Sequence, residues 1–237
     1  MSDLLSRLVA SRDAILLGEL AGLLHMIGKC SSAFIRSQAD DGGGRDPHQD
    51  LQQIPALSKV MSDPNLSMRF TFTVDGHQES LTKDFTDFIL KYKKRGSSGP
   101  DSFLLELFSY CHRMTSADEK GVLREKQRQS DTWISTPFGH NVRTIDLVQL
   151  DRDRNMADSA LAAAIEEFLS GGWDARVLRA RVIDILRLPL SRALGETRRP
   201  ANDVTLWAQS HGVASLYKPV LATLAMDLDP GPRTDLN

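Results

Sequence analysis

One histidine lies at the end of a strongly apolar helical segment. Leucine and isoleucine recur at helical spacing through residues 14–35, which predicts a helix over 11–27 with a broad buried stripe. His25 lies within the last turn of this helix, and Gly28 and Lys29 follow, as is typical of a helix C-terminus. An imidazole at this position can ligate a metal ion. The alternative is a core histidine whose ring is satisfied by a hydrogen bond.

Two later segments carry further groups that could take part in chemistry. Residues 115–121 read TSADEKG and contain Asp118, and His112 lies just before them near the end of a helix predicted over 102–114. Residues 198–218 read RRPANDVTLWAQSHGVASLYK and belong to a helix predicted over 204–225. Imidazole and carboxylate are common protein ligands of divalent metals. The three segments together are therefore candidates for one metal site.

These segments resemble a known family of metal-dependent enzymes. LLHMIGK at 23–29 resembles the L-L-H-D-I-G-K signature of the HD phosphohydrolase superfamily, in which a His-Asp pair supplies two ligands to a catalytic metal. TSADEKG looks like the A-D element of HD domains, where Asp118 matches the aspartate that completes the metal site. Segment 198–218 resembles the last helix of the circularly permuted HD domain that begins the large, polymerase-like subunit of type III CRISPR effector complexes. PFG at 137–139 and GETRRPANDVTLW at 195–207 are similar to one variant branch of that subunit.

The chain departs from the family pattern at the positions that bind metal. Met26 stands where the family has a carboxylate, and Ala208 and Gln209 stand where it has Asp-His. A neutral thioether is a poor ligand for a hard divalent cation. His211 lies two residues beyond Gln209, about 200° around the helix, and so cannot replace the lost ligand. We therefore expect no bound metal and no useful nuclease rate.

The resemblance also implies which site residues and partners remain. His25 and Asp118 are the remnant catalytic residues and remnant metal ligands, and His112, a neighbour with no placed counterpart in the family pattern, is added as a third candidate metal ligand. In the family a palm domain that makes cyclic oligoadenylate follows the HD domain, so the chain is expected to be a separate HD subunit or a fragment. The implied partners are the other subunits of a type III CRISPR ribonucleoprotein.

Three functional interpretations follow from these residues. The first is a catalytically degraded HD domain that acts as a scaffold or interaction module, with no cofactor. The second is a residual phosphohydrolase or single-stranded DNA nuclease that uses manganese, nickel or cobalt, with His48 or His140 recruited from loops. The third is a helical protein unrelated to HD enzymes whose matches are accidental.

Seven arginines and no lysine lie between Gly171 and Pro200. Guanidinium groups suit bidentate pairing with phosphate or carboxylate. One interpretation is contact with single-stranded DNA or RNA, and the alternative is intrachain ion pairs. The candidate nucleic-acid residues are Arg176, Arg179, Arg187, Arg198 and Arg199.

Composition indicates an ordinary globular protein. The 237 residues carry a net charge of −2, which gives no whole-chain argument for nucleic-acid or membrane binding. No signal peptide and no apolar run long enough to span a membrane is evident, so we expect a cytoplasmic protein without membrane contact. The two cysteines, Cys30 and Cys111, predict buried thiols rather than a disulfide framework.

The expected fold is mainly α, an HD-domain-like helical bundle with one or two short strands. It comprises one domain over 1–226 and a polar tail over 227–237. RFTFTV at 69–74 before Asp75-Gly76 predicts a strand and turn, and 142–149 is a second candidate strand. Asn202 or Asp203 is predicted to cap the last helix. Further helices are predicted over 2–9, 31–38, 81–95, 156–169 and 173–188.

Overall fold

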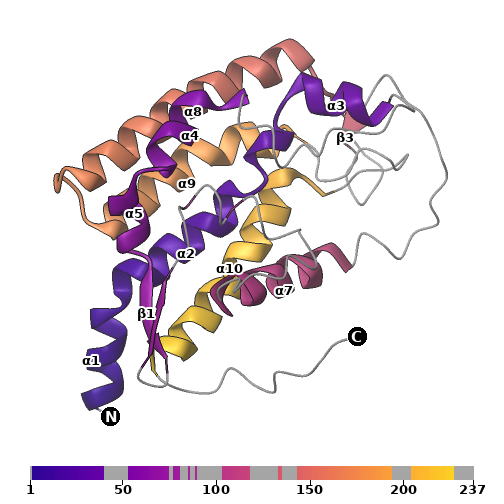
Figure 1. Cartoon of the computed structure of the whole chain (residues 1–237). Coiled ribbons are helices and arrows are strands. Elements are labelled where there is room, and N and C mark those ends of the chain that lie inside the picture. Colours follow the sequence, from indigo (N-terminus) through magenta and orange to yellow (C-terminus); the bar gives the residue numbers. More distant parts are fainter. Residues whose placement is uncertain are drawn as a thin grey trace.

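The chain is mainly α-helical, as predicted. The structure is a computed structural model that describes residues 2–39, 53–74, 77–80, 85, 89, 103–117, 133–134, 143–193 and 204–226. A 3-10 turn covers Ile27–Lys29. The helices (Figure 1) are α1 (Ser2–Ala10), α2 (Arg12–Leu24), α3 (Ser32–Ala39), α4 (Pro55–Met61), α5 (Pro64–Met68), α7 (Phe103–Ala117), α8 (Leu147–Leu169), α9 (Ala175–Ser191) and α10 (Leu206–Ala225).

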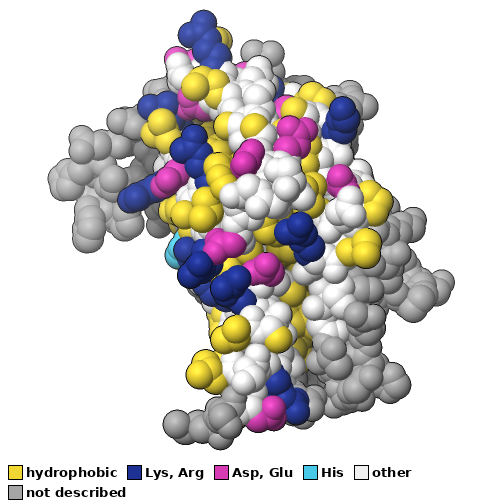
Figure 2. Space-filling view, turned by 90° about the vertical axis from the view of Figure 1, so that its left-hand side faces the viewer, with side chains coloured by type: hydrophobic (Ala, Val, Ile, Leu, Met, Phe, Trp, Pro, Cys, Tyr) yellow, Lys and Arg dark blue, Asp and Glu magenta, His cyan; other side chains and the backbone are white. Residues whose placement is uncertain are grey.

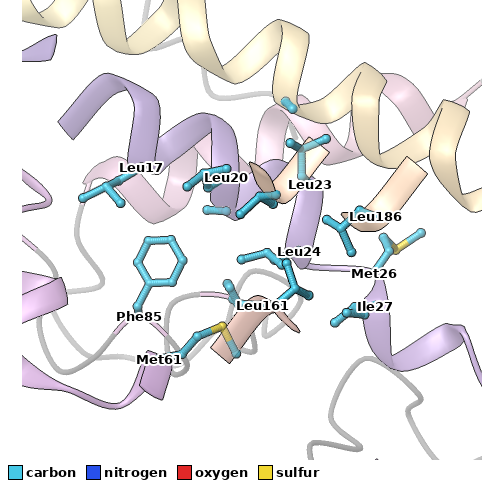
Figure 3. Packing of buried hydrophobic residues seen from close by; sticks show 14 of the residues in the cluster. Leu17, Leu20, Leu23, Leu24, Met26, Ile27, Met61, Phe85, Leu161 and Leu186 are labelled. Carbon is cyan, nitrogen blue, oxygen red and sulfur yellow. The ribbon is translucent and has the colours of Figure 1, made fainter. Parts of the chain in front are cut away.

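Helix α2 forms the centre of the core. Every residue from Ala14 to Leu24 is buried, because α10 covers one side of the helix and α9 another. Helices α2 and α10 run antiparallel, with Gly18 against Leu221 and Gly22 against Ala214. A Cβ atom on Gly22 would lie 2.6 Å from the Cα atom of Ala214, so only glycine permits this close approach. The apolar cluster around α2 includes residues of α4, α8 and α9 (Figure 3).

Two carboxylates of α8 hold the N-terminal ends of neighbouring helices. Asp158 accepts hydrogen bonds from the backbone N–H groups of Ala56 and Leu57, at the start of α4. Asp151 accepts from both the backbone N–H and the hydroxyl of Ser32, at the start of α3. Helices α4 and α5 were not predicted from the sequence, although Pro55 and Pro64 occupy the first helical turn, where proline is favoured.

Short antiparallel pairs supply the strands. Strand β1 (Thr71–Val74) pairs with β2 (His77–Ser80) so that Thr71 lies opposite Ser80, and this hairpin contains the strand predicted over 69–74. Strand β3 (Trp133–Ile134) pairs with β4 (Arg143–Thr144). The strand predicted over 142–149 is wrong beyond Thr144. The Asp146 carboxylate accepts the first backbone N–H groups of α8, and this cap starts the helix at Leu147 instead of residue 156.

Other helix boundaries also differ from the prediction. Helix α2 ends at Leu24 instead of residue 27, because the chain tightens into the 3-10 turn directly after His25 and Met26. Helix α10 begins after Thr205, whose hydroxyl accepts from the N–H of Ala208, so the predicted cap at 202 or 203 is wrong. The helix predicted over 81–95, apart from residues 85 and 89, and the tail 227–237 lie outside the described residues.

Candidate functional site

His25 is fixed at the C-terminal end of α2 and is 1% exposed. Its Nδ1 atom lies 2.6 Å from the carbonyl oxygen of Gly22, one turn earlier. Because a carbonyl oxygen only accepts hydrogen bonds, Nδ1 must carry the hydrogen. In the neutral form of this ring Nε2 carries a lone pair on the other side, away from its own helix.

His112 of α7 meets that lone pair. Its Nδ1 atom lies 3.1 Å from Nε2 of His25, although the two residues are 87 positions apart in the sequence. With a neutral His25 ring, Nε2 accepts and Nδ1 of His112 donates. The two rings are nearly perpendicular, and the ring of Phe108 packs edge-on against His25 with a centroid separation of 5.4 Å. The structure thus brings together two of the predicted site residues.

The geometry of this histidine pair is also compatible with a shared metal ion. Two nitrogens that each lie about 2.1 Å from one ion are roughly 3 Å apart. A ligating imidazole usually donates its other N–H to a backbone carbonyl or a carboxylate, as His25 does to Gly22. Among the described residues, however, no group of three or more His, Cys, Asp or Glu side chains could hold a metal. Two imidazoles alone are too few donors for a catalytic metal centre.

Asp118 lies outside the described residues. It directly follows Ala117, the last residue of α7, and is six positions beyond His112. His48 and His140, the loop histidines of the second interpretation, also lie outside the described part of the chain.

The two residues at lost-ligand positions are both buried. Met26 is completely buried in the apolar cluster, where Figure 3 draws it with Ile27 and Leu186. Gln209 is buried on α10. The antiparallel packing of α2 and α10 puts Ser210, one turn before Ala214, at the level of His25. The Ser210 hydroxyl is fully buried and has no hydrogen-bond partner among the described residues.

His211 lies on the solvent side of α10, as its spacing from Gln209 predicts. Its side chain is exposed, its ring packs on Trp207 with a centroid distance of 5.5 Å, and its Nδ1 atom lies 3.3 Å from the Ser215 hydroxyl. The lost ligand at residue 209 is therefore not replaced from the next turn of this helix.

A buried ion cluster joins α2, α9 and α10. Both carboxylate oxygens of Glu19 accept from the guanidinium of Arg179 at 2.6 Å, and Lys218 approaches the same carboxylate at 2.9 Å. Burial raises the pKa of Glu19, but the hydrogen bonds from the two cations outweigh it and hold the pKa below its ordinary value. This cluster was not predicted from the sequence. Its signal was a single acid within an otherwise apolar helix.

The remaining candidate nucleic-acid arginines divide into paired, exposed and undescribed residues. Arg176 pairs with Asp174, and its hydrogen bond lowers the pKa of that carboxyl to about 2. Arg187 is exposed and forms no ion pair with any described residue. Arg198 and Arg199 lie outside the described residues. With Arg179 on Glu19, intrachain pairs thus account for two of the three described candidates.

Both cysteines are buried thiols, as predicted. Burial raises the pKa of Cys30 to about 12 and that of Cys111 to about 11. A thiol that stays protonated at neutral pH is neither a nucleophile nor a metal ligand.

Comparison of the chain with family models, curated proteins and solved structures found no match. None of the described helices has the length and apolar character needed to cross a membrane.

Proposed function

We propose that this chain is an HD-type helical domain that has lost its catalytic metal site and serves as an interaction module of a type III CRISPR effector complex. The observation that supports the proposal is the meeting of His25 and His112. His25 belongs to the segment that resembles the HD signature, and His112 lies on the helix that leads to Asp118. Convergence of these two segments is expected of an HD domain, although the packing of both α2 and α7 on α10 would also bring them together.

The same site argues against hydrolysis. HD enzymes use a metal ion to generate hydroxide and to neutralise charge on the phosphoryl group. Among the described residues only two imidazoles remain, and His25 is closed to solvent. Met26 lies in the apolar core and offers no charge to a cation. The domain would therefore act through its surface, with the exposed Arg187 as one contact for single-stranded nucleic acid.

Reconstitution tests the scaffold proposal. The tagged chain is co-expressed with the other subunits and guide RNA of a type III complex, purified and analysed by size-exclusion chromatography. We expect the chain to elute with the complex, before and after treatment with chelator, because no metal contributes to its folding. Elution of the chain apart from a complete complex would contradict the proposal.

A residual metal-dependent phosphohydrolase is the second candidate. It is favoured by the 3.1 Å separation of the two imidazole nitrogens, which suits a shared ion. The test incubates the chain with single-stranded DNA and manganese, nickel or cobalt, and measures bound metal in parallel. This candidate requires cleavage that His25→Ala abolishes and that His211→Ala, at the exposed histidine, leaves unchanged. No cleavage with any of the three metals excludes it.

A further inference from the structure

A surface groove lies where α1 and the start of α2 meet the second half of α10. It has a volume of about 400 Å³ and is lined by Leu8, Ile15, Pro219 and Ala222. Arg12 and Lys218 also line it. The walls are therefore aliphatic, and the only charged groups among the lining side chains are two cations. Arg12 and Lys218 contribute their aliphatic stems to the walls, so an occupant is apolar inside the groove and carries any negative charge at its rim, beside Lys218.

The apolar surface continues from the groove onto α1. Leu5 is 63% exposed and Val9 is 62% exposed, while Leu8 between them is half-buried in the groove. Leu8 and Val9 follow Leu5 by three and four residues, so the three side chains lie on one face of the helix. At the lower end of the molecule in Figure 2, over α1, hydrophobic side chains are exposed among polar and charged ones. A nine-residue helix that buries so little of its apolar face gains little stability from the rest of the fold.

The cations at the groove leave a surplus positive charge. Glu19 carries one negative charge and is paired with both Arg179 and Lys218, so this cluster has a net charge of +1. Lys218 is only partly buried, and its ammonium has three hydrogens, of which Glu19 takes one. Arg12 is balanced by the exposed Asp13. Lys218 can therefore donate to a carboxylate on an occupant of the groove without giving up Glu19.

We propose that this groove and the exposed face of α1 bind an amphipathic helix of a partner protein that presents a Glu or Asp side chain to Lys218. A helix is favoured over a small amphiphile because a molecule that only fills the groove leaves Leu5 and Val9 in water. Helix α1 is about 14 Å long at 1.5 Å per residue, so a partner helix of roughly three turns would cover its whole face. Helix-in-groove recognition of this kind uses apolar anchors at i, i+3, i+4 and i+7.

Fluorescence anisotropy with a designed peptide tests this surface. The probe is a labelled helical peptide of about five turns, with leucines at i, i+3, i+4 and i+7 and glutamates beside the leucine stripe. A second peptide replaces each glutamate with lysine. We expect the glutamate peptide to bind about tenfold or more tightly than the lysine peptide. We also expect Leu5→Gln with Val9→Gln to weaken binding at least about tenfold, because each anchor buries a full aliphatic side chain and the replacements add no charge.

The matched control is Val148→Gln with Met156→Gln on α8. These side chains are as exposed as Leu5 and Val9 and are likewise separated by whole helical turns, but they lie away from the groove. The control should bind the glutamate peptide as the wild-type chain does. Since all four positions are exposed, thermal melting should show that both double variants are folded.

Several results would overturn the proposal. They are no binding of the glutamate peptide, equal binding of the two peptides, and binding that the α1 variant does not weaken. A wild-type dimer that the α1 variant makes monomeric in sedimentation would assign the face to a second copy. A photo-crosslink from residue 5 to residues 227–237 would assign it to the chain itself. The peptide assay contains no CRISPR component, so its outcome and that of the reconstitution are independent.

Discussion

Helix α2 carries two buried polar groups that are accommodated in opposite ways. Glu19 keeps its charge and is surrounded by two cations from α9 and α10. His25, six positions later, is held as one tautomer by Gly22 and accepts a hydrogen bond from His112 of α7. The Glu19 cluster is a closed set of ion pairs that joins three helices. The histidine pair includes hydrogen bonds from His25 to Gly22 and between His25 and His112.

The two groups therefore differ in whether they could bind a metal or a substrate. The Glu19 carboxylate has both oxygens bound by cations, so it has little capacity for a metal or a substrate. The hydrogen between His25 and His112 can be displaced by a metal, because both nitrogens then become ligands at a suitable separation. We therefore expect substitutions near Glu19 to change stability alone, and substitutions near His25 to change ligand binding as well.

The largest effect is expected at Met26, beside His25, where the difference between the Glu19 cluster and the histidine pair can be tested. Met26→Asp places a carboxylate in the apolar core and should cost about 3–5 kcal/mol of unfolding free energy in chelator. If residue 26 faces a former metal position, Met26→Asp with Gln209→His should regain part of this loss on addition of manganese. Urea unfolding with and without the metal measures the difference.

The control for Met26 is Met61→Asp on α4, which is equally buried in the same apolar cluster. It should lose a similar free energy of unfolding and recover none with manganese. If manganese restores as much free energy of unfolding to Met61→Asp as to Met26→Asp with Gln209→His, residue 26 does not face a metal position.

The next effect is expected at Glu19. Glu19→Gln leaves Arg179 and Lys218 without their carboxylate, and should cost about 2 kcal/mol because both cations remain partly solvated. The pKa of Glu19 is lower in the folded chain than its ordinary value of 4.5. The stability it contributes is therefore fully present above pH 4.5 and is lost as the pH falls through the depressed pKa. Urea unfolding between pH 3 and 6 should show a shallower acid limb for Glu19→Gln, and Glu106→Gln on the exposed side of α7 should leave it unchanged.

A smaller effect is expected at Gly22, which lies between the two polar groups. Gly22→Ala should cost about 1–3 kcal/mol, because the new methyl group meets the backbone of Ala214 at 2.6 Å and the two helices must separate. Gly18→Ala should cost less, since the atom it meets is the end of the Leu221 side chain, which can rotate. Thermal melting of both variants measures the difference, and an equal loss would indicate that the helices are free to shift at both positions.

The smallest effect is expected at Arg187. Arg187→Ala should change the free energy of unfolding by no more than about 0.5 kcal/mol, because the side chain is exposed and forms no ion pair with a described residue. If the proposed nucleic-acid contact is correct, Arg187→Ala should weaken binding of single-stranded DNA in a filter assay. Arg181→Ala, at another exposed arginine of α9, shows whether such a loss depends on position or only on charge.

The sequence predicted the elements that follow from local pattern. The buried stripe of α2 and the hairpin strand before Asp75-Gly76 were recognised because apolar spacing and turn chemistry are local signals. The early start of α8 was missed because one capping carboxylate at Asp146, rather than periodicity, sets it. Helices α4 and α5 were missed because each is shorter than two turns, and α4 is held at its start by Asp158 of α8.

The candidate site was predictable only in part. His25 and His112 could be named from their residue types, but their hydrogen bond depends on how α2 and α7 pack, which no local pattern encodes. The role of Arg179 was open between phosphate and carboxylate, since a guanidinium pairs with either. In the structure Arg179 pairs with the Glu19 carboxylate. A carboxylate buried in the central helix is costly unless a cation pairs with it, and Arg179 supplies that cation.

The packing of α2 on α10 has a consequence for how this protein matures. The two helices are separated by about 180 residues of chain, yet each provides much of the other's buried surface. During translation α2 emerges first, and the side of α2 that α10 covers stays exposed until α10 has left the ribosome. Such a long-range pairing slows folding and extends the time in which a nascent chain can aggregate. The need for chaperones during synthesis should therefore depend on the length of chain between these two helices.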